Sequence, residues 1–125
     1  MARRRFSEAN WRNDLWFLAL CRALLACTTE DELAAFLRDI GTLSELQAWS
    51  ERLEVARELA RGLKYRDITQ NTGASTTTVT RVARFLEDGA GGYRQVLRSF
   101  NDRGRHHGNR ARGEQSAVMR RKLRA

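Results

Sequence analysis

Residues 65–86 of this chain read YRDITQNTGASTTTVTRVARFL, and this stretch decides the fold. Its pattern predicts a short helix, a tight turn over residues 73–75, and a second helix that begins at Thr76. Gly73 can adopt the left-handed backbone conformation that such a turn needs. The Ser75 hydroxyl can cap the helix that follows. The stretch therefore predicts a helix-turn-helix.

The two faces of the second predicted helix differ in chemistry. Val79, Val82 and Leu86 recur three and four residues apart, as expected for a face turned toward a core, and Ile68 would meet them from the first helix. The opposite face carries hydroxyl groups and arginines, at Thr76, Thr77, Thr78, Thr80, Arg81 and Arg84. Threonine is a poor helix former, but its hydroxyl and methyl groups suit contacts to phosphates and base edges in a major groove. This pattern favours a DNA-reading helix over the solvated face of an ordinary helical hairpin.

The net charge of +8 is concentrated at the two ends of the 125-residue chain. Residues 1–5 hold three arginines, residues 101–125 hold eight basic and two acidic side chains, and the segment between them holds twelve basic and thirteen acidic ones. Basic ends on a nearly neutral middle predict a polyanionic partner. We expect nucleic acid rather than a membrane, because no basic amphipathic helix accompanies the ends. The alternative is that the basic ends serve only solubility.

The composition favours one mostly helical domain. The chain has the length of a single domain, no proline, nine glycines and 42% hydrophobic residues, which argues against a β-sandwich or a wholly disordered chain. We expect a basic arm over residues 1–10, a helical DNA-binding domain over residues 11–100 and a basic, disordered tail over residues 101–125.

The sequence gives no support for catalysis or metal binding. Cys21 and Cys27 lie six residues apart, so a helix would place them on different faces, and we expect reduced thiols in a cytoplasmic protein. His106 and His107 have no cysteine or carboxylate at ligand spacing. No phosphate-binding loop or activated nucleophile is apparent. We therefore expect no enzyme activity, metal or cofactor.

An apolar segment at residues 11–27, WRNDLWFLALCRALLAC, predicts a helix that needs covering. Over residues 15–27, Arg22 is the single polar residue, yet the run is shorter than the roughly 20 residues that cross a bilayer. A secretory signal is the alternative, because arginines precede the run and residues 24–27 resemble a lipoprotein cleavage box. Arg22 and the cytoplasmic role of a helix-turn-helix oppose it. A helix that is apolar on most sides must be covered on most sides, so we expect a second subunit.

Three further helices complete the expected set of about six. Capping-box patterns at Thr29 with Glu32 and at Thr42 with Glu45 predict helices over residues 29–40 and 42–61, ended by Gly41 and Gly62. Their expected inward faces are Leu33, Phe36, Leu37 and Ile40, and then Leu46, Trp49, Leu53, Ala56, Leu59 and Ala60. After a glycine-rich break over residues 87–92, a last helix over residues 93–100 offers Tyr93, Val96, Leu97 and Phe100 for burial.

Together these motifs resemble the Trp repressor superfamily, in particular its YerC/YecD-type branch. The resemblance covers about residues 11–98. It rests on TLSEL at 42–46, ERLEVA at 51–56, GLKYRDI at 62–68, TGASTTTVTRVAR at 72–84 and GGY at 91–93. It implies an all-α, intertwined homodimer whose N-terminal helices interlock and whose helix-turn-helix reads operator DNA in the major groove.

The resemblance also implies which residues contact double-stranded DNA. By motif position and by the polar face described above, they are Tyr65, Arg66 and Thr69 from the first helix, and Ser75, Thr76, Thr77, Thr78, Thr80 and Arg84 from the second.

In the Trp repressor two arginines hold the indole amino acid, and Arg52 and Arg81 stand at those positions here. Beside them the repressor has a glycine and a serine, where this chain has Val82 and Phe85. These bulky side chains should fill the space of an indole. Arg52, Arg81 and Phe85 thus mark a candidate effector pocket that we expect not to take tryptophan. The alternative role of the two arginines is ion pairing with Glu51, Glu54 or Asp67.

The sequence therefore predicts a homodimeric, sequence-specific, repressor-like regulator in the cytoplasm, on the nucleoid. The alternative is a non-specific nucleic-acid binder in which the basic tails do most of the binding. The ratio of specific to non-specific affinity separates the two.

Overall fold

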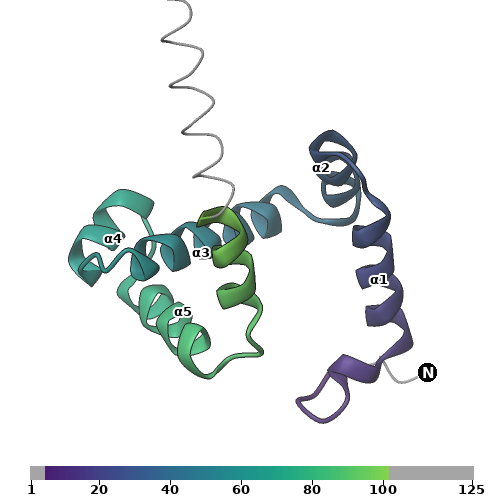
Figure 1. Cartoon of the computed structure of the whole chain (residues 1–125), viewed down its shortest axis with the longest axis horizontal. Coiled ribbons are helices and arrows are strands. Elements are labelled where there is room, and N and C mark those ends of the chain that lie inside the picture. The colour runs from purple at the N-terminus through teal and green to yellow at the C-terminus, as the bar shows by residue number, and fades with distance from the viewer. Residues whose placement is uncertain (1–4, 102–125) are drawn as a thin grey trace, which may run out of the picture. The chain divides into compact units, whose positions relative to one another are not determined.

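The computed structural model describes residues 5–101, and within them the chain is all-α, without strands. The order is η1 (Trp11–Asn13), α1 (Leu15–Ala26), α2 (Glu30–Ile40), α3 (Leu43–Ala60), α4 (Tyr65–Thr72), α5 (Thr76–Asp88) and a last helix at 92–101 (Figure 1). The all-α prediction is confirmed. Two compact units, residues 1–48 and residues 49–125, divide the chain. The first four residues of the predicted arm, and the predicted tail from residue 102 onward, lie outside the described residues.

The helix predicted over residues 11–27 is interrupted at Asp14. One oxygen of this side chain, Oδ1, accepts hydrogen bonds from the N–H groups of Trp16 at 2.9 Å and Phe17 at 3.1 Å. An N-cap residue takes an extended backbone, and Asp14 has ψ of 129°. The chain therefore forms the short 3-10 turn η1, bends at Asp14, and starts α1 afterwards.

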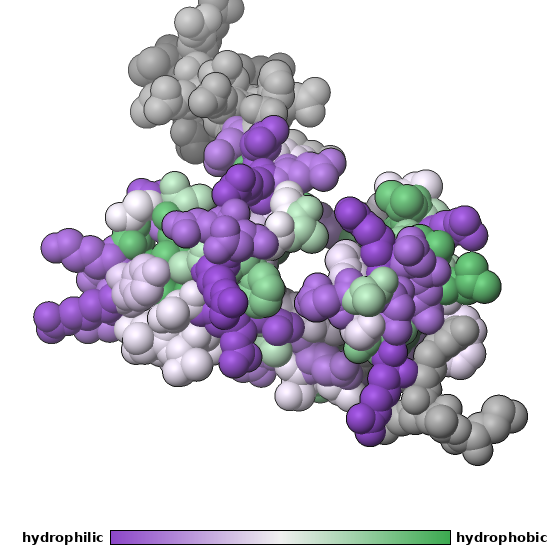
Figure 2. All heavy atoms as spheres, turned by 90° about the horizontal axis from the view of Figure 1, so that it is seen from below, coloured by the Kyte–Doolittle hydropathy of each residue, from purple (hydrophilic) through white to green (hydrophobic). Residues whose placement is uncertain are grey.

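The helix α1 is apolar and poorly covered by the described residues. None of its side chains is buried, and Leu15, Trp16 and Leu25 are 72%, 71% and 83% exposed. At its start, the rings of Phe6 and Trp11 pack edge-on against Phe17, with centroids 6.1 and 5.5 Å away. Figure 2 shows apolar side chains at the surface of this unit among polar ones. Among residues 5–101, no helix has both the length and the apolarity to span a membrane.

Threonine caps fix the starts of α2 and α3. The predicted box at α3 is reciprocal: Glu45 N–H donates to Thr42 Oγ1 at 3.1 Å, and Thr42 N–H donates to Glu45 Oε1 at 3.0 Å. At α2, Glu32 N–H donates to Thr29 Oγ1 at 3.1 Å as predicted, but Glu32 Oε2 accepts from Thr28 N–H at 2.9 Å, one residue earlier than the pattern implies. Bonds from the threonine N–H and hydroxyl groups favour the ionised acids and lower the pKa of Glu32 and of Glu45.

The core of the second unit lies between α3, α4, α5 and the last helix. Its buried members are Val55, Ala56, Ile68, Ala74, Val79, Val82 and Leu97, with Leu59, Leu63, Leu86 and Tyr93 packed against them. The inward face predicted for the helix-turn-helix is therefore confirmed. Both of its helices rest on the C-terminal half of α3.

Some residues predicted to face inward are exposed instead, namely Ile40, Trp49, Ala60, Val96 and Phe100. In α3 the buried side chains are Val55, Ala56 and Glu58. They cluster near the end of the helix because only that part meets the core. The predicted inward face followed one stripe along the whole of α3. It therefore included exposed residues such as Trp49 and omitted the buried Val55 and Glu58.

Candidate nucleic-acid interface

The turn between α4 and α5 has the geometry that the sequence predicts. Gly73 has φ of +76°, in the left-handed region, and its N–H donates to the Thr69 carbonyl at 3.0 Å. Ser75 Oγ accepts from Thr78 N–H at 3.1 Å, so α5 begins at Thr76. Ala74 fills the inside of the turn. The predicted helix-turn-helix is confirmed.

The outward face of α5 presents small hydroxyl groups and guanidinium groups to solvent. The exposed side chains are Thr76, Thr77, Thr80, Arg81 and Arg84. Thr78 is half-buried, and its hydroxyl lies 3.1 Å from Ser75 Oγ, so both of these side chains take part in the cap. Donors, acceptors and methyl groups thus alternate along one exposed surface, as contacts to phosphates and base edges require.

The DNA-contact residues predicted on α4 also divide into exposed and half-buried side chains. Tyr65 and Arg66 are exposed at the start of the helix. Thr69 is half-buried, and its hydroxyl donates to the Arg66 carbonyl at 2.8 Å. Tyr65 and Arg66, in the first turn of α4, are therefore more accessible to a partner than Thr69 in the next turn.

Basic side chains outnumber acidic ones along residues 61–84. Arg61, Lys64, Arg66, Arg81 and Arg84 are exposed, against one acidic residue, Asp67. Arg61 and Lys64 were not among the predicted site residues, although their place just before α4 is a signal that could have found them. This segment is a local positive surface within an otherwise nearly neutral folded part.

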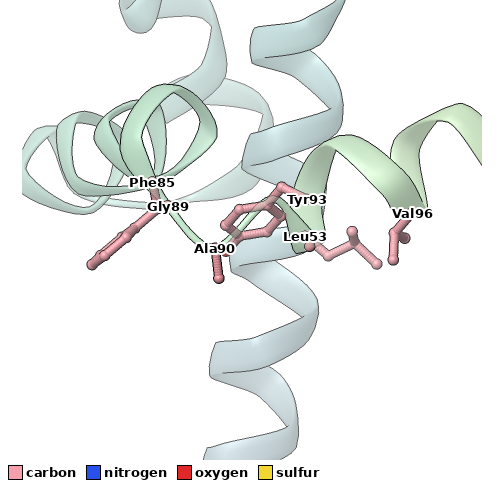
Figure 3. A pocket seen from close by; sticks show the side chains of 7 residues that line it. Leu53, Phe85, Gly89, Ala90, Tyr93 and Val96 are labelled. Atoms are coloured by element: carbon pink, nitrogen blue, oxygen red, sulfur yellow. The ribbon is translucent and has the colours of Figure 1, made fainter. Parts of the chain in front are cut away.

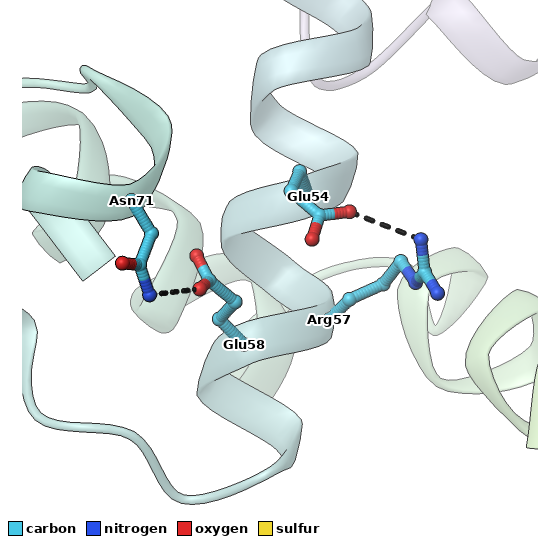
Figure 4. A network of polar contacts seen from close by, with 4 residues as sticks. All are labelled: Glu54, Arg57, Glu58 and Asn71. Carbon is cyan, nitrogen blue, oxygen red and sulfur yellow. Dashed lines mark hydrogen bonds and ion pairs between the residues drawn. The ribbon is translucent and has the colours of Figure 1, made fainter. Parts of the chain in front are cut away.

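The alternative of ion pairing for Arg52 and Arg81 is not seen. Glu54 pairs with Arg57 at 3.0 Å, one turn along α3 (Figure 4). Neither Arg52 nor Arg81 forms an ion pair with a residue of the described range.

An apolar groove of about 520 Å³ opens beside the end of α5 (Figure 3). Its lining residues are Leu53, Phe85, Gly89, Ala90, Gly92, Tyr93 and Val96. No charged side chain lines it, so the groove suits an apolar surface better than an amino acid with its two charges.

Of the residues of the candidate effector pocket, the groove includes Phe85 but neither arginine. Phe85 lines the groove, is 53% exposed and points away from α5, whereas Arg52 and Arg81 are not among the lining residues. Val82 is 2% exposed and packed in the core. Val82 therefore fills the interior as expected. Phe85 does not, because it lies beside the inward-facing stripe formed by the buried Val79 and Val82 and the partly buried Leu86.

Two polar contacts that support the helix-turn-helix were not predicted. Asn71 Nδ2 donates to the buried Glu58 Oε1 at 2.7 Å, which ties α4 to α3 (Figure 4). Arg94 donates to the carbonyls of Leu86 at 2.8 Å and Glu87 at 2.9 Å, which ties the last helix to the end of α5. Spacing alone does not show such contacts, because both join residues from different elements.

Metal ligands are not grouped in the part of the chain that the structure describes: no three of its histidine, cysteine, aspartate and glutamate residues come together. Cys21 and Cys27 are free and half-buried. His106 and His107, which we expect not to bind a metal, lie outside the described residues.

Comparison with known proteins gives consistent matches. The family model for the Trp repressor protein matches residues 16–101. YerC of Bacillus subtilis (strain 168), an uncharacterised protein, is 40% identical over 78 residues, which cover 62% of this chain and 75% of YerC.

Two crystal structures resemble the fold. A TrpR-like protein from Eubacterium eligens ATCC 27750 has a TM-score of 0.69 and 36% identity, over 71% of this chain and 92% of that one. A protein proposed to be a Trp repressor, from Staphylococcus aureus, has a TM-score of 0.71 and 32% identity, over 77% of this chain and 96% of that one. The family match, the YerC match and the confirmed helix-turn-helix agree: the chain belongs to the Trp repressor family, a family of DNA-binding regulators, and resembles its YerC-type members.

Proposed function

We propose that this protein is a homodimeric, sequence-specific transcriptional regulator of the repressor type that binds double-stranded DNA without tryptophan as corepressor. The observation that carries the proposal is the outward face of α5, where three threonines and two arginines stand exposed on a helix that is capped and packed on its other side. Residues 11–100 would form the DNA-binding domain, acting in the cytoplasm on the nucleoid.

The residues divide by the kind of DNA contact they suit. Thr76, Thr77 and Thr80 can meet base edges, since a short side chain lets the helix axis approach the groove floor. Arg84, Arg66 and Tyr65 suit phosphates, which place the protein on the duplex but carry no sequence information. Ser75, Thr78 and Thr69, whose hydroxyl groups already serve the caps and the backbone, would contribute through their remaining lone pairs and methyl groups.

Two uncovered apolar surfaces support the homodimer. One is α1, with Leu15, Trp16 and Leu25 exposed, and the other is the groove lined by Phe85 and Tyr93. Contiguous apolar surface left exposed on a small protein usually belongs to an interface. A second copy of the chain supplies the same surfaces in symmetric form.

The absence of a tryptophan requirement is inferred from Val82 and the groove. The Val82 side chain occupies core volume at the position where the repressor has glycine. The groove beside Phe85 has no cation in its lining that could hold a carboxylate. We therefore expect the DNA-binding conformation to be reached without an amino-acid effector.

Selection of bound duplexes from a random DNA pool tests the proposal. We expect one enriched, two-fold symmetric motif, whose affinity exceeds that of a scrambled duplex by a factor of about 10³ or more at the same salt concentration. Recovery of no motif, with similar affinity for every duplex, would favour the non-specific binder.

Deletion of residues 102–125 separates the contributions of the domain and the basic tail. This deletion removes the eight basic side chains of the C-terminal segment. It should lower affinity for all DNA alike and flatten the dependence of affinity on salt, because each released phosphate counterion contributes to the slope. A truncated protein that keeps the full salt slope would show that the tail does not contact the DNA.

A further inference from the structure

Glu58 is the charged side chain that the described part of the chain buries, with 5% of its surface exposed. It lies in the last turn of α3, where Oε1 accepts the hydrogen bond from Asn71 Nδ2 at 2.7 Å. Its other oxygen, Oε2, is also buried and accepts no hydrogen bond from residues 5–101. A buried carboxylate with one donor is costly, and an apolar residue of similar volume is often as stable or more so. Stability therefore does not explain why this position carries a glutamate.

The short helix α4 needs an orienting contact. Of its eight residues, Ile68 is the one that is buried. Apolar packing is not directional, so a helix held at one such point can rotate or lean about it. Asn71 follows Ile68 by three residues and lies on the same side of the helix. Its hydrogen bond to Glu58 supplies a second, directional point of attachment to α3.

Hydrogen bonds connect the end of α4, next to Asn71, to the start of α5. The next residue, Thr72, donates through its hydroxyl to the Ile68 carbonyl at 2.7 Å and accepts from Ala74 N–H at 3.1 Å. Ser75 then caps α5. Consecutive polar contacts thus join Asn71 to the first turn of α5, where Thr76 and Thr77 stand.

We propose that Glu58, acting through Asn71, is a positioning residue that sets the placement of α5 for reading DNA and lowers the stability of the fold in doing so. The inference rests on the proposed function and deepens it, because it names a buried residue that controls specificity without touching DNA. A purely structural residue would change stability and specificity in the same direction, whereas Glu58 should change them in opposite directions.

Three variants test this in the full-length protein. Glu58→Leu keeps the volume and removes the acceptor, Glu58→Gln keeps an oxygen for Asn71 and removes the charge, and Asn71→Ala removes the donor. Glu54→Gln, at a half-exposed position one turn earlier in α3, is the matched control. The measurements are the urea midpoint of unfolding and the ratio of affinities for the selected duplex and its scrambled version.

For Glu58→Leu we expect a higher urea midpoint and an affinity ratio lower by about tenfold, the factor that corresponds to one ordinary hydrogen bond. Asn71→Ala should lower the ratio by a similar factor. Glu58→Gln and the Glu54→Gln control should keep the wild-type ratio within about twofold.

The proposal would be overturned if Glu58→Leu kept the wild-type ratio of affinities for the selected and scrambled duplexes. If Glu58→Leu does not fold, a wild-type affinity ratio in Asn71→Ala would overturn it instead. So would a midpoint and a ratio that fall together in Glu58→Leu, or a Glu58→Gln protein that reads DNA as poorly as Glu58→Leu. A wild-type protein that prefers no sequence would instead refute the proposed function. The amide chemical shifts of residues 71–77 in the free protein then decide the positioning role: they should move in Glu58→Leu and Asn71→Ala but not in Glu58→Gln.

Discussion

At the scale of single residues, the threonines of α5 occupy positions where stability alone would favour other side chains. Each threonine loses side-chain freedom in a helix, and the chain places three in succession at the start of α5. The Ser75 cap and the buried Val79 and Val82 hold the helix in spite of this. Thr76 and Thr77 disfavour the local structure yet stand exposed side by side, which a partner explains better than the fold does.

Thr77→Ala should therefore change DNA preference more than it changes overall binding. Alanine is the better helix former, so the free energy of unfolding should rise by about 0.5 kcal/mol. Discrimination at one base pair should weaken by about 1 to 3 kcal/mol, while affinity for scrambled DNA stays constant. Affinity measurements over single-base variants of the selected site check this, with Gln95→Ala on the last helix as control. Unchanged base preference would place Thr77 away from the base edges.

The second residue-scale prediction concerns tryptophan. Calorimetry of the wild-type protein with millimolar L-tryptophan should show no binding heat, because Val82 is buried where an indole would need space. A Val82→Gly, Phe85→Ser variant reopens that space, at a cost in stability of about 2 to 5 kcal/mol that a melting experiment can follow. Phe85→Ser alone is the control, since Phe85 is already half exposed. Micromolar binding by the wild-type protein would contradict this interpretation of Val82.

At the scale of elements, the turns and helix caps were the features most readily predicted from the sequence. The turn at Gly73, the Ser75 cap and the reciprocal box of Thr42 with Glu45 depend on residues within a few positions of one another, and the structure confirms them. The break before α1 was missed because the whole stretch 11–27 was assigned to one helix, although Asp14 stands directly before the apolar run, at the position of an N-cap.

Contacts between elements were harder to predict, for a physical reason. Which face of α3 is buried depends on how much of that helix meets the core, and periodicity alone does not contain that information. For the same reason, neither the bond between Glu58 and Asn71 nor the apolar groove beside Phe85 could be derived from spacing. On α5 the sequence predicted the exposure of Thr76, Thr77, Thr80, Arg81 and Arg84, but not that Thr78 is half-buried or that Arg52 and Arg81 do not line that groove.

The capping box of α3 predicts a dependence of stability on pH. The folded-state pKa of Glu45 is lowered from the ordinary 4.5 because the ionised carboxylate accepts hydrogen bonds from Thr42. A lowered pKa means that this contribution is fully present above pH 4.5 and is lost as pH falls through the folded-state value. Glu45→Ala should therefore lower the melting temperature more at pH 7 than at pH 3, while Gln47→Ala should show no such dependence. An equal loss at both pH values would show that the charge of Glu45 does not matter.

At the scale of the whole molecule, the uncovered apolar residues of α1 predict a dimer. Leu25→Asp distinguishes a free surface from an interface, because Leu25 is 83% exposed within one chain and its substitution in a monomer should be nearly neutral. In a dimer it buries an unpaired charge, which costs several kcal/mol. Light scattering should give twice the chain mass of 14.4 kDa for the wild-type protein and the single mass for the variant. Asn13→Asp is the control, and a wild-type particle of the single mass would exclude the dimer.

The contact between Arg94 and the end of α5 has a consequence for how the chain responds to cutting. The three residues at 89–91 link α5 to the last helix without helical structure of their own, yet Leu97 beyond them is part of the core and Arg94 holds the carbonyls of Leu86 and Glu87. A protease that cleaves this linker should leave two fragments that stay associated and still bind the selected duplex. They should separate only in denaturant, so the cut would appear on a denaturing gel while the native mass stays unchanged. The linker is therefore the place where the chain could be opened, or given new termini, without dismantling the domain.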